Sequence, residues 1–404
     1  MQPPTAAPSA LLLGAGSDAV ALFEAQQARL HAMLQGTARS YQMKEHTLSH
    51  HGKDASFAFF QGKQGQLKGH DFPFFLCKNN GFEGSVTDLA GEVLTASNAH
   101  PSDELVLDIG SNSGFYGTMA AAHGYSVIAF DLQEDCLHMA HAALKRFAER
   151  AEVLQLGLSS TTATVSLSSG KCDGSNFFKE GGSAALGEGS TVLAMPLDVV
   201  ASLPSMTNTF SKLMRFVKID VEGAEAIAVA GMHGLLSSGR ILNLAVEITP
   251  DAWHRFASIM PFAQQVAQLA DVVNVHGYRA FTLFMPRGVR RLTDALSPSI
   301  ATRVPPGQLP GHVSPPCGVD AYEIHDFAQF VNLYCMKQAG SPPFGKGKCG
   351  NVWFTRVHLP AGDVTVKTPV DASPETAWVQ SPTTALSAPT TGFSSSPDTG
   401  GAVQ

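Results

Sequence analysis

The chain has 404 residues, and 44% of them are hydrophobic, which is enough apolar material for the core of an enzyme-sized globular protein. Its formal net charge is −7 and its pI is about 6.1, so it lacks the basic footprint that nucleic-acid binding requires. Two short basic stretches, 144–146 and 287–291, are too small to change this prediction and indicate solvated surface.

The first apolar run, residues 9–23, starts without basic residues and is interrupted by Asp18. It therefore predicts a loop and a helix rather than a signal peptide or a membrane span. The six cysteines show no C-x-x-C spacing, so they do not indicate a zinc site, and no N-x-[ST] glycosylation acceptor occurs. A reducing compartment, the cytoplasm, is the default expectation, although a disulfide among the three late cysteines stays open.

Residues 1–102 form an extension before the main motifs, and aromatic residues alternate there at period two. Phe57 and Phe59 precede a Gly/Gln/Lys loop, and Phe72 and Phe74 follow it. This pattern predicts a hairpin lying over the core, with hydrophobic packing favoured over stacking on a substrate ring. Three histidines at helical spacing have no acid or cysteine partner in the pattern and are interpreted as surface residues: His46, His50 and His51.

The most informative stretch is VLDIGSNSG, residues 106–114, which predicts a strand, a glycine turn and the start of a helix. It reads D-x-G-x-N-x-G and not the dinucleotide fingerprint G-x-G-x-x-G. A carboxylate at Asp108 repels a pyrophosphate but attracts the α-ammonium of S-adenosylmethionine. The next strand, 125–131, ends at Asp131, where a carboxylate can accept both hydroxyls of a ribose.

The alternation of strands and helices continues with a helix at 134–150 and a third strand at 151–159, whose Leu158 would lie beside an adenine. Two alternating stretches then predict an inserted hairpin. The fourth strand, 215–220, ends at Asp220, and a helix follows it as far as Gly239. Ligands bind at the carboxyl ends of such strands, so Asp108 and Asp220 are expected to face one crevice.

Lys218 and Asp220 are two residues apart and share a face of the predicted fourth strand. A charged pair in a strand that is buried on both faces needs a reason. For Lys218, a structural ion pair and a functional role stay equally open, whereas the acids Asp220 and Glu222 favour function.

Five blocks in this order carry a resemblance to a known family: VLDIGSNSGFYG, AFDLQ, the Leu197-Asp198 pair, VKIDVEGAE and AVEITP. Together they resemble the FkbM-type methyltransferases, a branch of the class I S-adenosylmethionine-dependent enzymes. The resemblance covers about 103–285 and resumes at 350–357. The chain departs from the family at Asp131-Leu132, where Glu-Pro is common, and in an insertion at 289–349.

The resemblance implies an α/β, Rossmann-like class I methyltransferase fold with a mostly parallel seven-stranded sheet and an antiparallel last strand. The expected domains are the extension 1–102, a methyltransferase domain 103–358 with its insertion, and a disordered Ser/Thr/Pro-rich tail, 359–404. The implied activity (EC 2.1.1.-) is methylation of a hydroxyl oxygen on a sugar or natural product, a small-molecule or glycan acceptor.

Two sets of site residues follow. The cofactor set is Asp108, Gly110, Ser111, Asn112, Gly114, Asp131, Leu132 and Leu158. The set for proton transfer or substrate orientation is Lys218, Asp220, Glu222 and Glu247. Its three acids could also collect Mg²⁺, but no spacing demands a metal and none is assigned. Two alternatives remain: a binding module that keeps the fold without catalysis, and, less favoured, an NAD-dependent oxidoreductase.

Overall fold

A computed structural model of the chain describes residues 17–356, apart from 37–38, 40, 61–71, 78–82, 97, 168–170, 173–177, 181–190, 284–296, 306–307, 314–316, 318–320 and 336–349. The chain divides into two units, Met1–Gly362 and Asp363–Gln404, and every described residue belongs to the first unit. The predicted disordered tail therefore lies outside the described residues.

The helices are α1 (Ser17–Gly36), α2 (Gly84–Thr95), α3 (Phe115–Ala122), α4 (Glu134–Leu144), α5 (Leu197–Ser202), α6 (Thr207–Phe210), α7 (Glu225–Ala230), α8 (His233–Ser237), α9 (Pro250–Trp253), α10 (Phe262–Asn274) and α12 (Phe327–Gln329). The strands are β1 (Met43–His50), β2 (Lys53–Phe60), β3 (Glu104–Ile109), β4 (Ser126–Asp131), β5 (Ala151–Gln155), β6 (Gly157–Leu158), β7 (Ala163–Leu167), β8 (Phe178–Glu180), β9 (Thr191–Met195), β10 (Leu213–Ile219), β11 (Asn243–Ile248), β12 (Arg279–Leu283), β13 (Ala301–Val304), β14 (Ala321–Ile324) and β15 (Gly350–Thr355).

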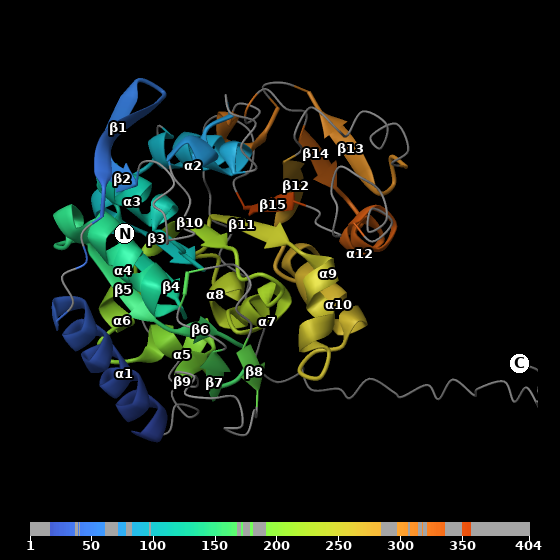
Figure 1. The fold of residues 1–404 in the computed structure, drawn as a ribbon. Coiled ribbons are helices and arrows are strands. Elements are labelled where there is room, and N and C mark those ends of the chain that lie inside the picture. Colours follow the sequence, from blue (N-terminus) through green and yellow to red (C-terminus); the bar gives the residue numbers. More distant parts are fainter. Residues whose placement is uncertain are drawn as a thin grey trace, which may run out of the picture. The chain divides into compact units, whose positions relative to one another are not determined.

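The central sheet has the order β13-β14-β12-β15-β11-β10-β3-β4-β5 (Figure 1). Its strands β5, β4, β3, β10 and β11 are parallel, and β15 runs antiparallel to both of its neighbours. This arrangement confirms the predicted Rossmann-like class I methyltransferase fold. It also places the strands that end at Asp108 and Asp220 side by side, because β3 pairs with β10.

The sheet has nine strands and not the seven that were predicted, because the late insertion adds β13 and β14 beyond β12. Both added strands are antiparallel to their neighbours and only four residues long. Such short segments carry too little alternation to stand out in a sequence.

Two hydrophobic clusters cover the two faces of the sheet. On one face, α2, α3, α4 and β2 pack against apolar side chains such as Val106, Phe216 and Ala245. On the other face, α5, α7, α8 and α10 pack against side chains such as Leu107 and Ile219. Burial on both faces explains why these strands read as nearly continuous apolar runs in the sequence.

The strand predicted at Phe57 and Phe59 is confirmed as β2, but the predicted hairpin with Phe72 and Phe74 is wrong. β2 contains Phe57 and Phe59 and pairs with β1, which precedes it, while Phe72–Phe75 forms a short 3₁₀ helix. The proline at position 73 cannot donate to a strand ladder, which disfavours the predicted pairing. Phe57 and Phe59 are fully buried and pack against Phe115 in α3, with ring centroids 6.1 and 5.3 Å away. The packing interpretation of these two rings is thus confirmed.

The three N-terminal histidines also differ from their prediction, since they lie in and just after β1 and not on a helix. His46 stacks on Phe72 with ring centroids 3.7 Å apart, and burial lowers its pKa. His51 pairs with Glu92 at 2.7 Å, and His50 lies 3.7 Å from Asp88. His51 is exposed, as predicted, whereas His46 and His50 are half-buried between the hairpin and its neighbours.

The inserted hairpin is confirmed, because β7 and β9 pair antiparallel within a second sheet of order β6-β9-β7-β8. The predicted third strand is divided, since β5 belongs to the central sheet and β6 to the smaller one. The helix predicted after Asp220 is likewise divided into α7 and α8, and Gly239 follows α8 with a left-handed φ of 71°.

The cysteines form disulfides, contrary to the expectation of free thiols in a reducing compartment. Cys77 pairs with Cys317, Cys136 pairs with Cys172, and Cys335 is also disulfide-bonded. Disulfides persist in oxidising environments, so these pairs count against the cytoplasmic default. Among the described residues, no helix is both long and apolar enough to cross a membrane.

Candidate active site

The glycine turn after β3 adopts the left-handed backbone conformation that its glycines predict. Gly110 and Gly114 have φ values of 75° and 78°, and Asn112 between them has a φ of 50°, a left-handed conformation that asparagine tolerates. The amides of Gly110 and Ser111 both donate to the carbonyl of Phe130 in β4 at 2.9 Å. The turn is therefore tied to the neighbouring strand before α3 begins.

Asp108 lies in β3 at its carboxyl end and is almost completely buried, with 1% of its surface exposed. Its Oδ2 accepts a hydrogen bond from the amide of Gly117 in α3 at 2.8 Å. Burial raises the pKa of Asp108 to about 7, although this hydrogen bond and the nearby Lys218 both favour the charged form. Burial thus disfavours the carboxylate, and a ligand cation beside it would favour the charged form.

Asp131 stands at the end of β4, next to the turn. Its Oδ2 accepts from the amide of Asn112 and its Oδ1 from that of Gln133, both at 2.9 Å. Burial raises its pKa to about 6. Leu132, the next residue, is half-buried and packs against the small sheet, whereas Leu158 is buried in the main cluster.

The turn and the end of β10 approach each other closely. The amide of Asp220 donates to the carbonyl of Ile109 at 2.9 Å. A Cβ on Gly110 would lie 1.8 Å from the carbonyl oxygen of Asp220, so only glycine fits there. Backbone contact thus joins the two strand ends, and the structure brings Asp108 and Asp220 to neighbouring strands, as predicted.

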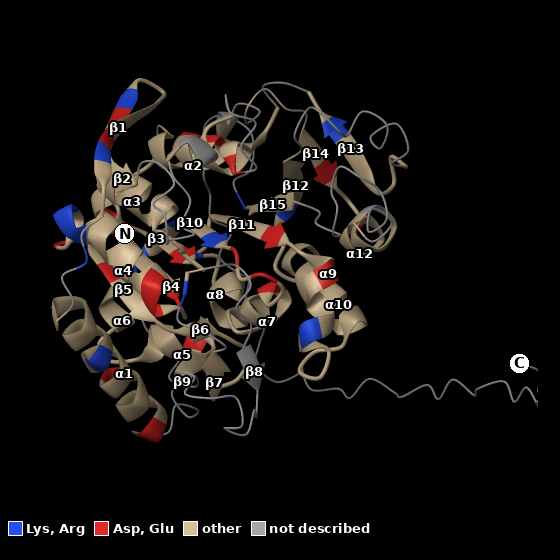
Figure 2. Cartoon of the chain, viewed as in Figure 1, with Lys and Arg blue, Asp and Glu red and all other residues tan. Residues whose placement is uncertain are grey.

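Acids gather at the ends of β10 and β11 (Figure 2). The carboxylates of Asp220, Glu222 and Glu247 have oxygens within 4.8 Å of one another. Lys218 is 1% exposed, and its Nζ lies 3.0 Å from Oδ2 of Asp220. Burial opposes its charged form, but the acids Asp220, Glu83 and Glu247 together raise its pKa.

This acid cluster offers hard oxygen ligands of the kind that Mg²⁺ prefers. Lys218 already brings one positive charge to it, so a divalent cation would compete with the ammonium for Asp220. Glu222 is half-buried and lies in the turn after β10. Its left-handed φ of 50° is uncommon for a residue other than glycine and costs conformational energy.

Two residues of the site were missed by the sequence reasoning, namely Glu83 and Tyr116. Tyr116 lies in the first turn of α3, and its hydroxyl donates to Oε2 of Glu83 at 2.6 Å. Burial and Glu83 raise the pKa of Tyr116, so the phenol stays protonated. Lys218 Nζ lies 5.7 Å from the centre of the Tyr116 ring, and Glu83 is among the acids that raise the pKa of Lys218.

Glu83 immediately precedes α2 in the extension, far along the chain from the motifs, so no local pattern indicates its role. Tyr116 was visible within the first block, but there it resembles an ordinary core aromatic. Together they connect the extension, the turn helix and β10 around one buried ammonium group.

Glu225, the second glutamate of the VKIDVEGAE block, has a structural role. It is fully buried, and its carboxylate accepts from the amide of Gly223, the hydroxyl of Thr249 and the indole of Trp253 at 2.7 to 2.8 Å. Burial raises its pKa to about 7. The block therefore contains one acid that fixes the turn after β10 and two, Asp220 and Glu222, that belong to the acid cluster.

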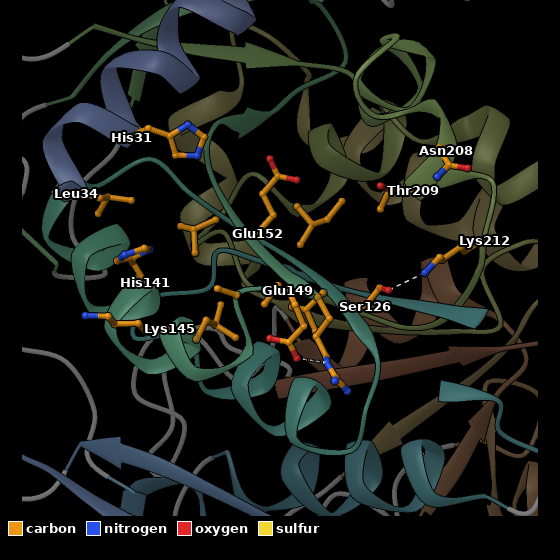
Figure 3. Close-up of a pocket in the computed structure, with 17 residues that line it drawn as sticks. His31, Leu34, Ser126, His141, Lys145, Glu149, Glu152, Asn208, Thr209 and Lys212 are labelled. Atoms are coloured by element: carbon orange, nitrogen blue, oxygen red, sulfur yellow. Dashed lines mark hydrogen bonds and ion pairs between the residues drawn. The ribbon is translucent and has the colours of Figure 1, made fainter. Parts of the chain in front are cut away.

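A cavity of about 540 Å³ lies at the opposite edge of the sheet (Figure 3). It is lined by residues at the amino ends of β4 and β5, such as Ser126 and Ala151, and by His31 of α1. Lys212 donates to the Ser126 hydroxyl there at 2.7 Å. None of the predicted site residues lines this cavity.

No protein-family model matches the chain, and no curated protein matches it significantly. Three solved methyltransferases show a distant likeness. Precorrin-6y C5,15-methyltransferase from Geobacter metallireducens GS-15 is 11% identical, with 55% of this chain and 78% of that chain covered and a TM-score of 0.26. Human methyltransferase 10 domain containing protein is 11% identical, with 75% and 97% covered and a TM-score of 0.27.

The bifunctional kinase-methyltransferase WbdD is 15% identical, with 55% of this chain and 34% of that chain covered and a TM-score of 0.21. At these identities and TM-scores, the likenesses carry no argument about activity or acceptor. The functional argument therefore depends on the residues of the site.

Proposed function

We propose that this protein is an S-adenosylmethionine-dependent methyltransferase that acts on a hydroxyl oxygen of a sugar or natural product. The observation that carries the proposal is the buried Asp108 at the end of β3, beside a glycine turn and one strand away from Asp131. A buried acid at this place favours a donor that carries an ammonium group over one that carries a pyrophosphate.

The residues present fit the donor. In the described part of the chain, the Ser111 hydroxyl is buried and has no hydrogen-bond partner, so a polar group is left for a ligand at the turn. Asp108 would hold the α-ammonium, and Asp131 would accept the ribose hydroxyls. When bound, S-adenosylmethionine supplies a methyl group on a sulfonium sulfur.

Asp220 is the proposed general base. Its carboxylate would accept the proton that the acceptor hydroxyl loses when the oxygen takes the methyl group. Lys218 keeps Asp220 in place through their 3.0 Å contact, and Glu222 and Glu247 would orient the acceptor. Positioning can supply roughly 7 to 11 kcal/mol of the acceleration, and a base adds about a hundredfold or more.

The class of acceptor rests on the resemblance of the five sequence blocks to FkbM-type enzymes. The insertion at 289–349 departs from that family, so the identity of the hydroxyl compound needs an unbiased search. Incubation of the protein with methyl-labelled donor and a cell extract, followed by identification of labelled products, would find it.

Calorimetry with S-adenosylhomocysteine tests the proposal directly. The wild-type protein should bind one equivalent, and Asp108→Ala should abolish binding because the ammonium loses its partner. Asp220→Asn should lose methyl transfer while its affinity for S-adenosylhomocysteine changes much less. Wild-type protein that binds NADH and ignores S-adenosylhomocysteine would contradict the proposal.

A further inference from the structure

The Cys136–Cys172 disulfide lies directly against the glycine turn. Cys136 is in the first turn of α4, and both cysteines are buried. The sulfur of Cys172 is 3.3 Å from Oδ1 of Asn112. A disulfide sulfur has no proton to donate, so this is a packing contact that holds the Asn112 side chain from one side.

The same face of α4 supports the turn at a second point. Cys136 and Ala140 are four residues apart and so lie one above the other on the helix. A Cβ on Gly114 would lie 2.8 Å from Cα of Ala140, which shows how closely α4 packs on the turn. Two left-handed residues of the turn are thus held from this side: Gly114 by α4 and Asn112 by the disulfide attached to α4.

Asn112 connects this support to the donor site. Its amide donates to Oδ2 of Asp131, the acid proposed to bind the ribose, at 2.9 Å. Asparagine tolerates its left-handed conformation, and the contacts with Asp131 and with the disulfide sulfur fix it there. Loss of the covalent link would release the chain at Cys172 and remove one of the contacts that fix Asn112.

We propose that the Cys136–Cys172 disulfide is a positioning element of the donor site, which holds Asn112 and, through its amide, Asp131. This inference rests on the proposed function, since it concerns the affinity of the same site for its donor. It predicts that the protein with this bond intact binds the donor product more tightly than the protein without it.

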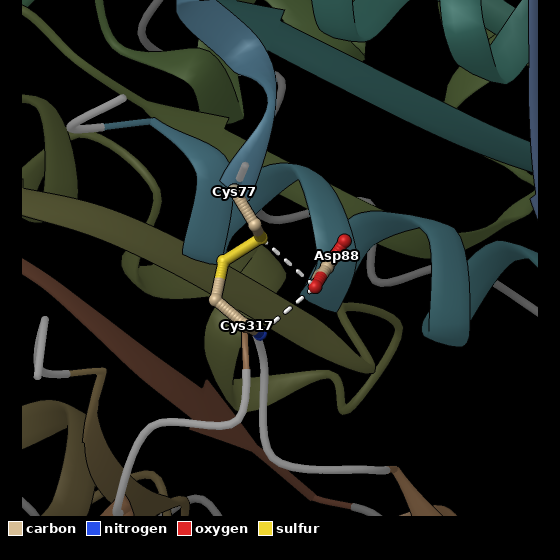
Figure 4. Close-up of side chains that lie close together, drawn as sticks. All are labelled: Cys77, Asp88 and Cys317. Carbon is tan, nitrogen blue, oxygen red and sulfur yellow. Dashed lines mark hydrogen bonds between the residues drawn. A yellow bond between two sulfur atoms is a disulfide. The ribbon is translucent and has the colours of Figure 1, made fainter. Parts of the chain in front are cut away.

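The second disulfide provides a matched control (Figure 4). Cys77–Cys317 joins the extension to the late insertion, across 240 residues of sequence. Its neighbour is Asp88, whose Oδ2 accepts from the amide of Cys317 at 2.8 Å. Its loss should lower thermal stability at least as much, because it closes the longer loop. Among the described residues, its contacts are with Gly84 and Asp88 of α2 and not with the turn.

The experiment is calorimetry of S-adenosylhomocysteine with two double variants, accompanied by thermal unfolding. Cys136→Ala/Cys172→Ala should raise the dissociation constant about fivefold or more. Cys77→Ala/Cys317→Ala should leave it within about twofold of wild type while lowering the unfolding temperature. Equal affinity of wild type and Cys136→Ala/Cys172→Ala would overturn the inference, and so would an equal loss in both double variants.

If Cys136→Ala/Cys172→Ala does not fold, the bond can be cut in the folded control variant that also carries Cys335→Ala, because Cys335 is disulfide-bonded as well and its bond would otherwise be reduced too. Dithiothreitol gives two electrons and two protons to each disulfide and is itself oxidised to its cyclic disulfide, and a thiol count verifies the reduction. Weaker binding after reduction supports the inference, and unchanged binding overturns it. Absence of binding by the oxidised wild-type protein would instead contradict the proposed function itself.

Discussion

At the scale of single residues, the central feature is the buried carboxyl group of Asp108, a residue that is 1% exposed. Asp108 has a pKa raised by burial to about 7 and Asp131 one raised to about 6. For a carboxyl group, a raised pKa in the folded state means that folding favours the protonated form. Its contribution to stability is present below its unfolded pKa of about 3.9 and is lost as the pH rises through its folded pKa.

This sign gives a prediction for Asp108→Asn, which keeps an acceptor for the Gly117 amide but has no charge to bury. The free energy of unfolding of wild type should fall between pH 5 and pH 8 by more than that of the variant. At pH 8 the variant should be the more stable protein and yet bind S-adenosylhomocysteine poorly. Urea unfolding at both pH values checks this, and equal pH dependence would show that Asp108 is not the group that titrates.

The buried ammonium of Lys218 provides a second prediction. Lys218→Met leaves Asp220, Glu83 and Glu247 without their shared cation and should cost about 3 to 5 kcal/mol of stability. Adding Glu83→Gln should recover part of this loss, with a coupling of about 1 kcal/mol or more.

Glu104→Gln is the matched control for the double-mutant cycle of Lys218→Met and Glu83→Gln. Glu104 is also a buried acid, but it pairs with Arg215 at the amino end of the sheet, where NH2 of the arginine lies 2.5 Å from its carboxylate. Combined with Lys218→Met, its effect should be additive. Additive behaviour of Glu83→Gln as well would remove Glu83 from the Lys218 cluster.

The sequence predicted where some of these residues lie in the fold and not where others lie. Asp108, Gly110 and Asp131 could be predicted because they stand at fixed offsets within one strand-turn-helix-strand motif. Glu83 and Tyr116 could not, because their contact joins positions 33 residues apart through the fold. The disulfide pairs could not be deduced either, since six cysteines allow fifteen full pairings.

At the scale of elements, the site depends on how closely the turn after β3 meets the end of β10. Gly110→Ala would place a methyl group 1.8 Å from the Asp220 carbonyl oxygen, so the two strand ends would have to separate. We expect a loss of at least about 4 kcal/mol in stability, or failure to fold.

Gly277→Ala isolates the backbone strain from this collision. Gly277 has a φ of 71°, close to that of Gly110, but a Cβ there would meet nothing within 4 Å. Its replacement should cost only about 1 to 2 kcal/mol. Similar unfolding free energies for the two variants would show that the close approach of the strands is not what makes Gly110 necessary.

Strands with a strong local sequence pattern could be predicted, whereas strands that form only because a neighbouring strand pairs with them could not. The strands β3, β4, β10 and β11 are apolar runs bounded by acids and turns, and they were found. β1, with the sequence MKEHTLSH, has few apolar residues and becomes a strand because β2 pairs with it. Strand propensity of this kind depends on tertiary context.

At the scale of the whole molecule, the order of the sheet brings the proposed site together. Strands β3 and β10 are neighbours although more than a hundred residues separate them in sequence, and β4 and β11 flank them. The motif resemblance implied this α/β arrangement, whereas the two strands of the insertion and the covalent links to it were beyond it. The cavity of about 540 Å³ lies at the amino ends of β4 and β5, away from these residues.

A crystal structure of the protein with S-adenosylhomocysteine tests the central claim most directly. The account predicts that the ligand lies at the carboxyl ends of β3 and β4, with its ammonium at hydrogen-bond distance from Asp108 and its ribose on Asp131. A ligand bound at the opposite edge of the sheet, or one that leaves both carboxylates without contact, would contradict it.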